Sequence, residues 1–198
     1  ARIIMEKSPY ETILRDTIKD SYERLIAPSI EREIRNELTE KAEEQAIKVF
    51  AANLKSLLLQ PPIKGKTVMG FDPAYRTGCK IAVLDETGKL LDTATVYATP
   101  PQNKVEESKE ILKELIKKHN VDIISLGNGT ASRESEKICA EIIKEMDRPL
   151  HYVIVNEAGA SVYSASELAA QEYPDVNVSL RGAISIGRRL QDPLAELV

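Results

Sequence analysis

The chain has 198 residues, of which 42% are hydrophobic and 29% charged, a composition that argues against intrinsic disorder and allows one full domain with an additional segment. Its net charge of −4 argues against nonspecific nucleic-acid binding over the whole surface but leaves room for a local basic face. The longest apolar runs are far shorter than the roughly 20 residues that span a bilayer, so we expect a cytoplasmic protein without a membrane partner.

Two amphipathic helices are predicted before the Pro61-Pro62 pair. Apolar residues recur every three to four positions over residues 11–26, and Pro28 is expected to end this first helix. A longer apolar stripe follows over residues 30–58, with steps that are mostly of four residues. A coiled coil would alternate steps of three and four, so we expect this helix to pack against other parts of the parent protein.

After Gly65 the hydrophobic pattern changes its period. Three predicted strands are joined by short loops, one of them through Gly88, which favours antiparallel neighbours. Helices and strands then alternate, and the resulting order β-β-β-α-β-α-β-α predicts a mixed α/β sheet. The predicted strands are 67–71, 80–84, 90–97, 121–126 and 151–155, and the predicted helices are 105–116, 132–146, 161–172 and one from residue 180 onward.

This order places three polar residues at one edge of the predicted sheet. Helical crossovers connect the first, fourth and fifth strands in parallel and with a right-handed sense, so the carboxyl ends of these strands meet at the same edge. Asp72 follows the first strand, Asn128 the fourth and Glu157 the fifth. Ligands bind at this edge in open α/β sheets, and we therefore expect the functional site there.

Carboxylates that converge at such an edge favour a divalent cation. Mg²⁺ takes oxygen ligands, and two such ions about 4 Å apart promote in-line displacement at a phosphodiester. Asp72 and Glu157 are the candidate metal ligands, and Asp192 on the last helix could complete a catalytic group of three. Each acid also has an ordinary interpretation, because Asp72 could cap its own loop and the other two could begin helices.

Backbone N–H groups and guanidinium groups offer a second kind of contact, with phosphate. The turn Gly127-Asn128-Gly129-Thr130 opens a predicted helix and could present free N–H groups to an anion as a ligand loop. A guanidinium group can pair with phosphate through two hydrogen bonds, and its alternative role is an intrachain ion pair. The candidate nucleic-acid-binding arginines are Arg76, Arg133, Arg181, Arg188 and Arg189.

Four long motifs occur in order along the chain. They are residues 72–80 (DPAYRTGCK), 127–134 (GNGTASRE), 156–166 (NEAGASVYSAS) and 188–198 (RRLQDPLAELV). In this order they closely resemble the bacterial Tex family of transcription accessory proteins. The resemblance implies that residues 1–62 are the end of the family's N-terminal helical region and that residues 65–198 are its YqgF-like domain, which has a ribonuclease H-like fold.

The resemblance also implies function. It indicates a nucleic-acid-binding protein that acts in transcription, with RNA or DNA, the transcription machinery and the remaining domains of the parent protein as partners. Active members of the wider fold bind metal through three carboxylates, which Asp72, Glu157 and Asp192 match by motif. The sequence departs from this pattern at Asn128, an amide where related resolvases have an acid. One negative charge fewer weakens Mg²⁺ binding, and the Tex-type domain is usually regarded as nonhydrolytic.

Three functional hypotheses result. The first is a nonenzymatic nucleic-acid-binding or scaffold domain of a Tex-like factor, which requires no cofactor. The second is a nuclease or Holliday-junction-resolvase-like phosphodiesterase that depends on Mg²⁺ or Mn²⁺. The third is nucleotide binding, because Gly70-Phe71-Asp72 before a hairpin resembles the phosphate loop of actin-like ATPases, although those proteins also need a second lobe.

Overall fold

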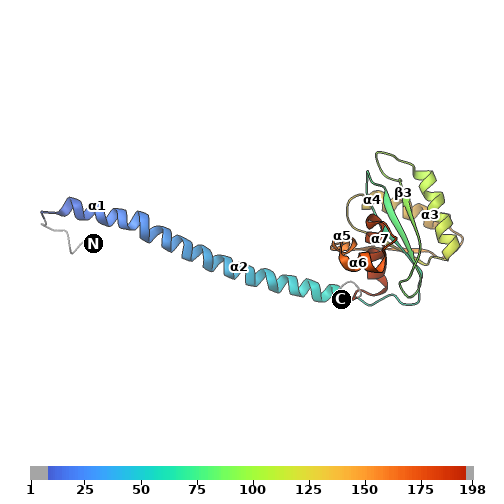
Figure 1. Ribbon diagram of the computed structural model, residues 1–198, viewed down its shortest axis with the longest axis horizontal. Helices are drawn as coiled ribbons and strands as arrows, with labels where there is room; N and C mark the ends of the chain where they lie inside the picture. The colour runs from blue at the N-terminus through green and yellow to red at the C-terminus, as the bar shows by residue number, and fades with distance from the viewer. Residues whose placement is uncertain (1–8, 195–198) are drawn as a thin grey trace. The chain divides into compact units, whose positions relative to one another are not determined.

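The computed structural model describes residues 9–194, so the last four residues of the fourth motif lie outside it. Within this range the chain forms two compact units, divided after Ser56, and each is described by itself (Figure 1). The first unit is helical and the second is built on a β-sheet. None of the helices in residues 9–194 has the length and apolar character needed to cross a membrane.

The helical unit is one continuous helical stretch. Helix α1 (Glu11–Ser21) leads through a π-helical turn, η1 (Tyr22–Ile26), into α2 (Ala27–Leu58). The prediction that Pro28 ends the first helix is wrong. A proline normally interrupts a helix because it lacks an N–H group and its ring meets the carbonyl four residues earlier. The wider π turn ends at Ile26, two residues before Pro28, so the backbone changes its hydrogen-bond spacing there and remains helical.

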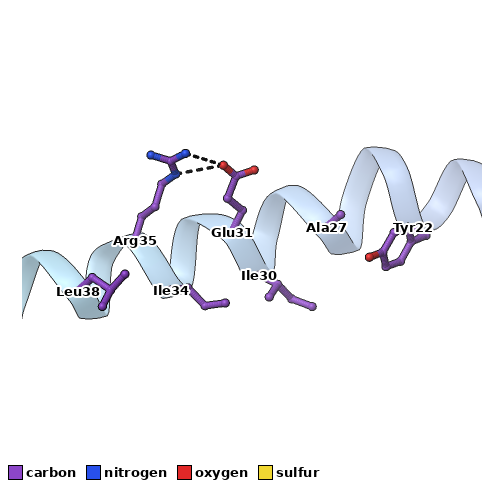
Figure 2. A pocket seen from close by; sticks show the side chains of 7 residues that line it. All are labelled: Tyr22, Ala27, Ile30, Glu31, Ile34, Arg35 and Leu38. Atoms are coloured by element: carbon purple, nitrogen blue, oxygen red, sulfur yellow. Dashed lines mark hydrogen bonds and ion pairs between the residues drawn. The ribbon is translucent and has the colours of Figure 1, made fainter.

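An apolar stripe on α2 is exposed in this unit. Figure 2 shows Ile30, Ile34 and Leu38 on one side of the helix, away from the Glu31–Arg35 ion pair. Ile34 is 51% exposed and Leu38 is 61% exposed. A step of four residues advances by about 40° around a helix, so the stripe winds around α2. Packing of this stripe against other parts of the parent protein stays a prediction.

The second unit contains a five-stranded sheet in the order β3-β2-β1-β4-β5. The pairs β1–β2 and β2–β3 are antiparallel, whereas β1–β4 and β4–β5 are parallel. This topology confirms the predicted ribonuclease H-like mixed sheet with an α-helical segment before it. The strands are β1 (Val68–Asp72), β2 (Cys79–Leu84), β3 (Leu90–Val96), β4 (Ile123–Gly127) and β5 (His151–Val155).

Helices pack on both faces of the sheet (Figure 1). The main hydrophobic core lies on one side of it. Side chains of α3 and α4 pack against Phe71 and its neighbours on one face, and α7 lies across β1 and β2 on the other. Strands covered on both faces are largely apolar, in agreement with the uninterrupted burial of β2 and β4. The helices are α3 (Val105–His119), α4 (Ser132–Glu145), α5 (Ala160–Ser164), α6 (Glu167–Glu172) and α7 (Val178–Gln191).

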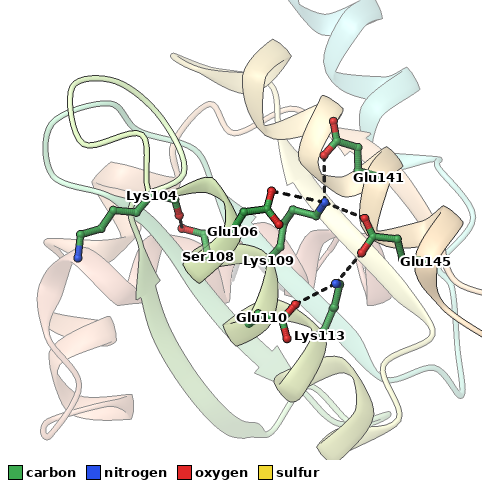
Figure 3. A network of polar contacts seen from close by, with 8 residues as sticks. All are labelled: Lys104, Glu106, Ser108, Lys109, Glu110, Lys113, Glu141 and Glu145. Carbon is green, nitrogen blue, oxygen red and sulfur yellow. Dashed lines mark hydrogen bonds and ion pairs between the residues drawn. The ribbon is translucent and has the colours of Figure 1, made fainter.

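Ion pairs connect α3 to α4 (Figure 3). The Lys109 ammonium lies 2.7 Å from the carboxylate of Glu145 and 3.2 Å from that of Glu141, and Lys113 also pairs with Glu145. Hydrogen bonds from Lys109 and then Lys113 lower the pKa of Glu145 to about 2. The network therefore joins the two helices that cover one face of the sheet.

Helix α7 lies very close to β1 because a glycine stands at the crossing. A Cβ atom at Gly70 would lie only 2.0 Å from the carbonyl oxygen of Ala183. The Ser125 hydroxyl of β4 donates a hydrogen bond of 2.7 Å to the carbonyl of Ile186 on the same helix. The glycine crossing and this hydrogen bond determine the distance between α7 and the central strands. They also place the first half of α7 beside the carboxyl end of β1.

Candidate functional site

Asp72 is the last residue of β1 and lies on the α7 face of the sheet. Side chains alternate along a strand, and Phe71 points into the core on the opposite face. Lys80 of β2 is directly opposite Asp72 in the antiparallel register, so the two side chains share a face. Helix α7 presents Gly182 to this carboxylate, and a Cβ atom there would lie 3.0 Å from Asp72 Oδ2.

The environment of Asp72 favours its protonated form. Burial, followed by the negative charge of Glu157, raises the pKa of Asp72 from 3.8 to about 6, and the positive charge of Lys80 opposes this rise. Lys80 is itself buried, and its ammonium donates hydrogen bonds to the carbonyls of Thr77 and Gly78. The carboxylate at the end of β1 thus has a fixed cation of the protein beside it.

Glu157 reaches the same edge from the loop after β5. Its backbone N–H donates to Asn128 Oδ1 at 3.2 Å, and the N–H of Asn128 donates to the Val155 carbonyl at 3.0 Å. A Cβ atom at Gly127 would lie 2.5 Å from Glu157 Oε2, and one at Gly129 would lie 1.6 Å from Oε1. The carboxylate therefore fills the space above these two glycines. Its Oε2 atom is buried and has no hydrogen-bond partner among the residues described.

The turn that the sequence offers as an anion-binding loop faces this carboxylate. Gly127 ends β4, and the left-handed Ala131 precedes the first residue of α4. The Asn128 side chain uses its amide oxygen on the backbone of Glu157. The structure thus brings Asp72, Asn128 and Glu157 to one edge, with a negative charge of the protein itself over the turn.

Asp192 lies at the opposite edge. It follows the end of α7, ten residues after Gly182, which corresponds to about 15 Å along a helix. The preceding Gln191 donates at 2.6 Å to the carbonyl of Asp85, the residue after the end of β2. Since β2 is antiparallel to β1, this is the amino end of β1. The structure therefore does not bring Asp192 to Asp72, because α7 runs from one edge of the sheet to the other.

Three of the five candidate arginines form contacts inside the domain. Arg181 donates to the carbonyl of Tyr173 at 3.0 Å, and Arg189 donates to the carbonyl of Asn156 at 2.8 Å. Arg188 donates to the carboxylate of Glu172 at 3.0 Å, and its guanidinium lies 5.2 Å from the centroid of the Tyr173 ring. These contacts fasten the segment between β5 and α7 to α7.

The other two candidate arginines are exposed and lie close to the site. Arg76 follows Asp72 in the β1–β2 loop, and Arg133 is the second residue of α4. Their neighbours join the two segments, because the Tyr75 hydroxyl donates a 3.2 Å hydrogen bond to the carboxylate of Glu134. Two exposed guanidinium groups thus come from segments that meet beside the acidic edge.

Comparison with known families adds a decisive finding to this geometry. A family described as the Tex protein YqgF-like domain matches residues 66–191. The chain belongs to this family. The match lies entirely within the sheet-containing unit, and it confirms the resemblance that the four sequence motifs indicate.

Relatives of this Tex domain are much longer proteins. YdcI of Bacillus subtilis is 61% identical, over 94% of this chain and 26% of its own length. Transcriptional accessory protein Tex of Neisseria gonorrhoeae is 55% identical, over 93% and 24%. The human S1 RNA-binding domain-containing protein 1 is 46% identical, over 94% and 19%. The chain thus spans about a quarter or less of the length of these relatives.

A solved structure is also similar. It is T. thermophilus RuvC in complex with a Holliday junction substrate, with a TM-score of 0.43 and 15% sequence identity. The similarity covers 61% of this chain and 90% of the RuvC chain.

The acidic edge of this Tex domain does not fit a pair of divalent cations. Helix α7 presents Gly182 to Asp72, so no third carboxylate comes from the helix at this point. The Asn128 amide oxygen already accepts a hydrogen bond from Glu157. Within residues 9–194 no group of three or more His, Cys, Asp or Glu side chains could hold a metal ion. Asp72 and Glu157 together offer fewer ligands than a two-metal centre requires.

Two residues of this site were not predicted from the sequence. Lys80 was not predicted because a short connection favours antiparallel strands without fixing their register, and only that register places Lys80 opposite Asp72. Gly182 was not predicted because its position depends on where α7 crosses the sheet. A lysine at the start of a buried strand was the one available signal, since lysine is rarely buried without a partner.

Proposed function

We propose that this Tex domain binds the phosphates of RNA or DNA without hydrolysing them, as a binding or scaffold part of a transcription accessory protein. The observation that supports this most is the meeting of the Arg76 and Arg133 segments at the carboxyl edge of the sheet. Both side chains are exposed, and the Tyr75–Glu134 hydrogen bond holds the segments together. Guanidinium groups in such a pair can contact successive phosphates of one strand.

The setting in transcription rests on the relatives. One of them is named transcriptional accessory protein and another S1 RNA-binding domain-containing protein. We infer that the partners are nucleic acid, the transcription machinery and the remaining domains of the longer parent protein. The chain has a net charge of −4, so binding by a local basic site should be weak and strongly dependent on salt.

The binding proposal is tested by fluorescence anisotropy with labelled single-stranded RNA, single-stranded DNA and duplex DNA at several salt concentrations. We expect the double variant Arg76→Ala/Arg133→Ala to bind about 10-fold more weakly, and the dependence of log affinity on log salt to become less steep by about 2 for a duplex. Lys117→Ala is the matched control, because it removes one exposed positive charge from α3. An unchanged affinity of the double variant would contradict the proposal.

The rival hypothesis is a Mg²⁺- or Mn²⁺-dependent nuclease. One observation favours it. Glu157 Oε2 is buried near Asp72 and has no hydrogen-bond partner among the described residues, which is expected of a carboxylate oxygen that coordinates a metal ion. With either metal we expect no cleavage of RNA, duplex DNA or a four-way DNA junction, because the site offers too few carboxylates. Cleavage by the native chain that disappears in Asp72→Asn would establish the rival function instead.

A further inference from the structure

The loop that carries Glu157 is held on both sides. On the sheet side, Asn128 Oδ1 accepts a hydrogen bond from the Glu157 N–H. On the helix side, Arg189 Nη1 donates to the carbonyls of Asn156 and Ala158, at 2.8 and 2.6 Å. One guanidinium group therefore binds the residue before Glu157 and the residue after it.

The part of α7 that carries Arg189 is hydrogen-bonded to the sheet. Arg189 is on α7, and its Nη2 atom lies 3.4 Å from the hydroxyl of Ser185, one turn earlier on the same helix. The next residue, Ile186, accepts the buried hydrogen bond from Ser125 of β4. Because this part of α7 is fixed to the sheet, its guanidinium group can hold the Glu157 loop at a defined height over β4.

The Glu157 carboxylate lies in a confined space beside two glycines. Gly127 and Gly129 provide the space that Oε2 and Oε1 occupy, so the carboxylate lies against the β4–α4 loop. Its negative charge is close enough to Asp72 to raise the pKa of that residue. The position of the Glu157 backbone decides whether its carboxylate can occupy the space beside Gly127 and Gly129.

We propose that Arg189 is a positioning residue, which holds the Glu157 carboxylate over Gly127 and Gly129 beside Asp72. The contacts of its guanidinium with Asn156 and Ala158 assign it to the Glu157 loop rather than to nucleic acid. The role concerns the placement of one carboxylate and does not depend on whether the domain binds RNA or DNA. Its test and the binding test above can therefore fail independently.

The experiment follows the backbone amide signal of Gly129 in NMR spectra of the ¹⁵N-labelled chain. Glu157→Gln removes the charge that lies against Gly129, so it should shift the amide signal of this residue clearly. In an Arg189→Met background we expect the shift caused by Glu157→Gln to be about half as large or smaller. The reason is that the effects of substitutions at coupled residues are not additive. A residue that only stabilises the fold would leave the shift unchanged as long as the protein is folded.

The controls separate displacement from unfolding. Gly129→Ala should displace the carboxylate from the other side, because its Cβ would lie 1.6 Å from Oε1, and the effect of Glu157→Gln on the Gly127 amide should then decrease in the same way. If Arg189→Met does not fold, Arg189→Gln takes its place, since the glutamine side chain is shorter and lacks the guanidinium group that binds both carbonyls. Equal effects of Glu157→Gln with and without Arg189 would overturn the proposal.

Discussion

Gly70→Ala should destabilise the sheet-containing unit by about 3 kcal/mol, near the upper end of typical overpacking effects. The added Cβ would lie 2.0 Å from the carbonyl oxygen of Ala183 and 3.0 Å from the backbone nitrogen of Gly187. Both atoms belong to the backbone of α7, so no side-chain rotation can relieve the contact. The helix must move away from β1, and the packing on this face of the sheet is lost with it.

Urea unfolding followed by tyrosine fluorescence measures this effect in a chain that has seven tyrosines and no tryptophan. Gly182→Ala is the matched control on α7. Its Cβ meets only the flexible end of the Asp72 side chain, and alanine is favoured over glycine in a helix by about 1 kcal/mol, so we expect a change smaller than this value. A Gly70→Ala variant as stable as the native chain would show that α7 can yield at this crossing.

Asp72→Asn should stabilise the domain at pH 7 to 8 by about 2–3 kcal/mol. Burial and the charge of Glu157 raise the pKa of Asp72 from 3.8 to about 6, so keeping this carboxylate ionised in the folded state is unfavourable by that amount. Asparagine has nearly the same shape and carries no charge, and it removes this penalty. A stabilising substitution at a position of this kind is typical of a residue kept for function.

The direction of the pKa shift of Asp72 determines how its contribution to the stability of the domain changes with pH. Because the pKa of Asp72 is higher in the folded than in the unfolded chain, the folded state binds more protons between pH 3.8 and about 6. The contribution of Asp72 to stability therefore falls as the pH rises through this window and stays constant above it. We expect the advantage of Asp72→Asn to shrink as the pH falls through this window and to be nearly lost at about pH 4. Thermal unfolding between pH 4 and 8 measures it, and the exposed Asp175→Asn is the control. An advantage that does not vary with pH would contradict the assignment.

The alternation of strands and helices allowed most of the fold to be predicted from the sequence. The spacing of apolar residues in β1, β2 and β4 and the short antiparallel connections were sufficient for the strand order. The same order predicted that Asp72 and Glu157 follow parallel strands, because parallel strands end at one edge. The continuous helix through Pro28 was not predicted, because the π turn before it has no clear sequence signal.

Two side-chain placements could not be predicted in the same way. Asp192 was expected on the last helix, but it directly follows the end of α7, whose direction across the sheet carries it to the far edge. Arg189 has the sequence appearance of a phosphate ligand, yet its guanidinium binds two carbonyls of the Glu157 loop. Both outcomes depend on how a helix crosses the sheet, and hydrophobic spacing along the chain does not contain that information.

The amino-acid sequence by itself determined the family, the order of strands and helices, and the edge of the sheet at which Asp72, Asn128 and Glu157 appear. The tertiary structure decided which charges meet there. It placed Lys80 opposite Asp72, put a glycine of α7 where a third acid would be needed, and gave Arg189 to the Glu157 loop. The physical reason is that periodicity and short connections act locally, whereas strand register and helix crossing depend on how separate elements pack at close range.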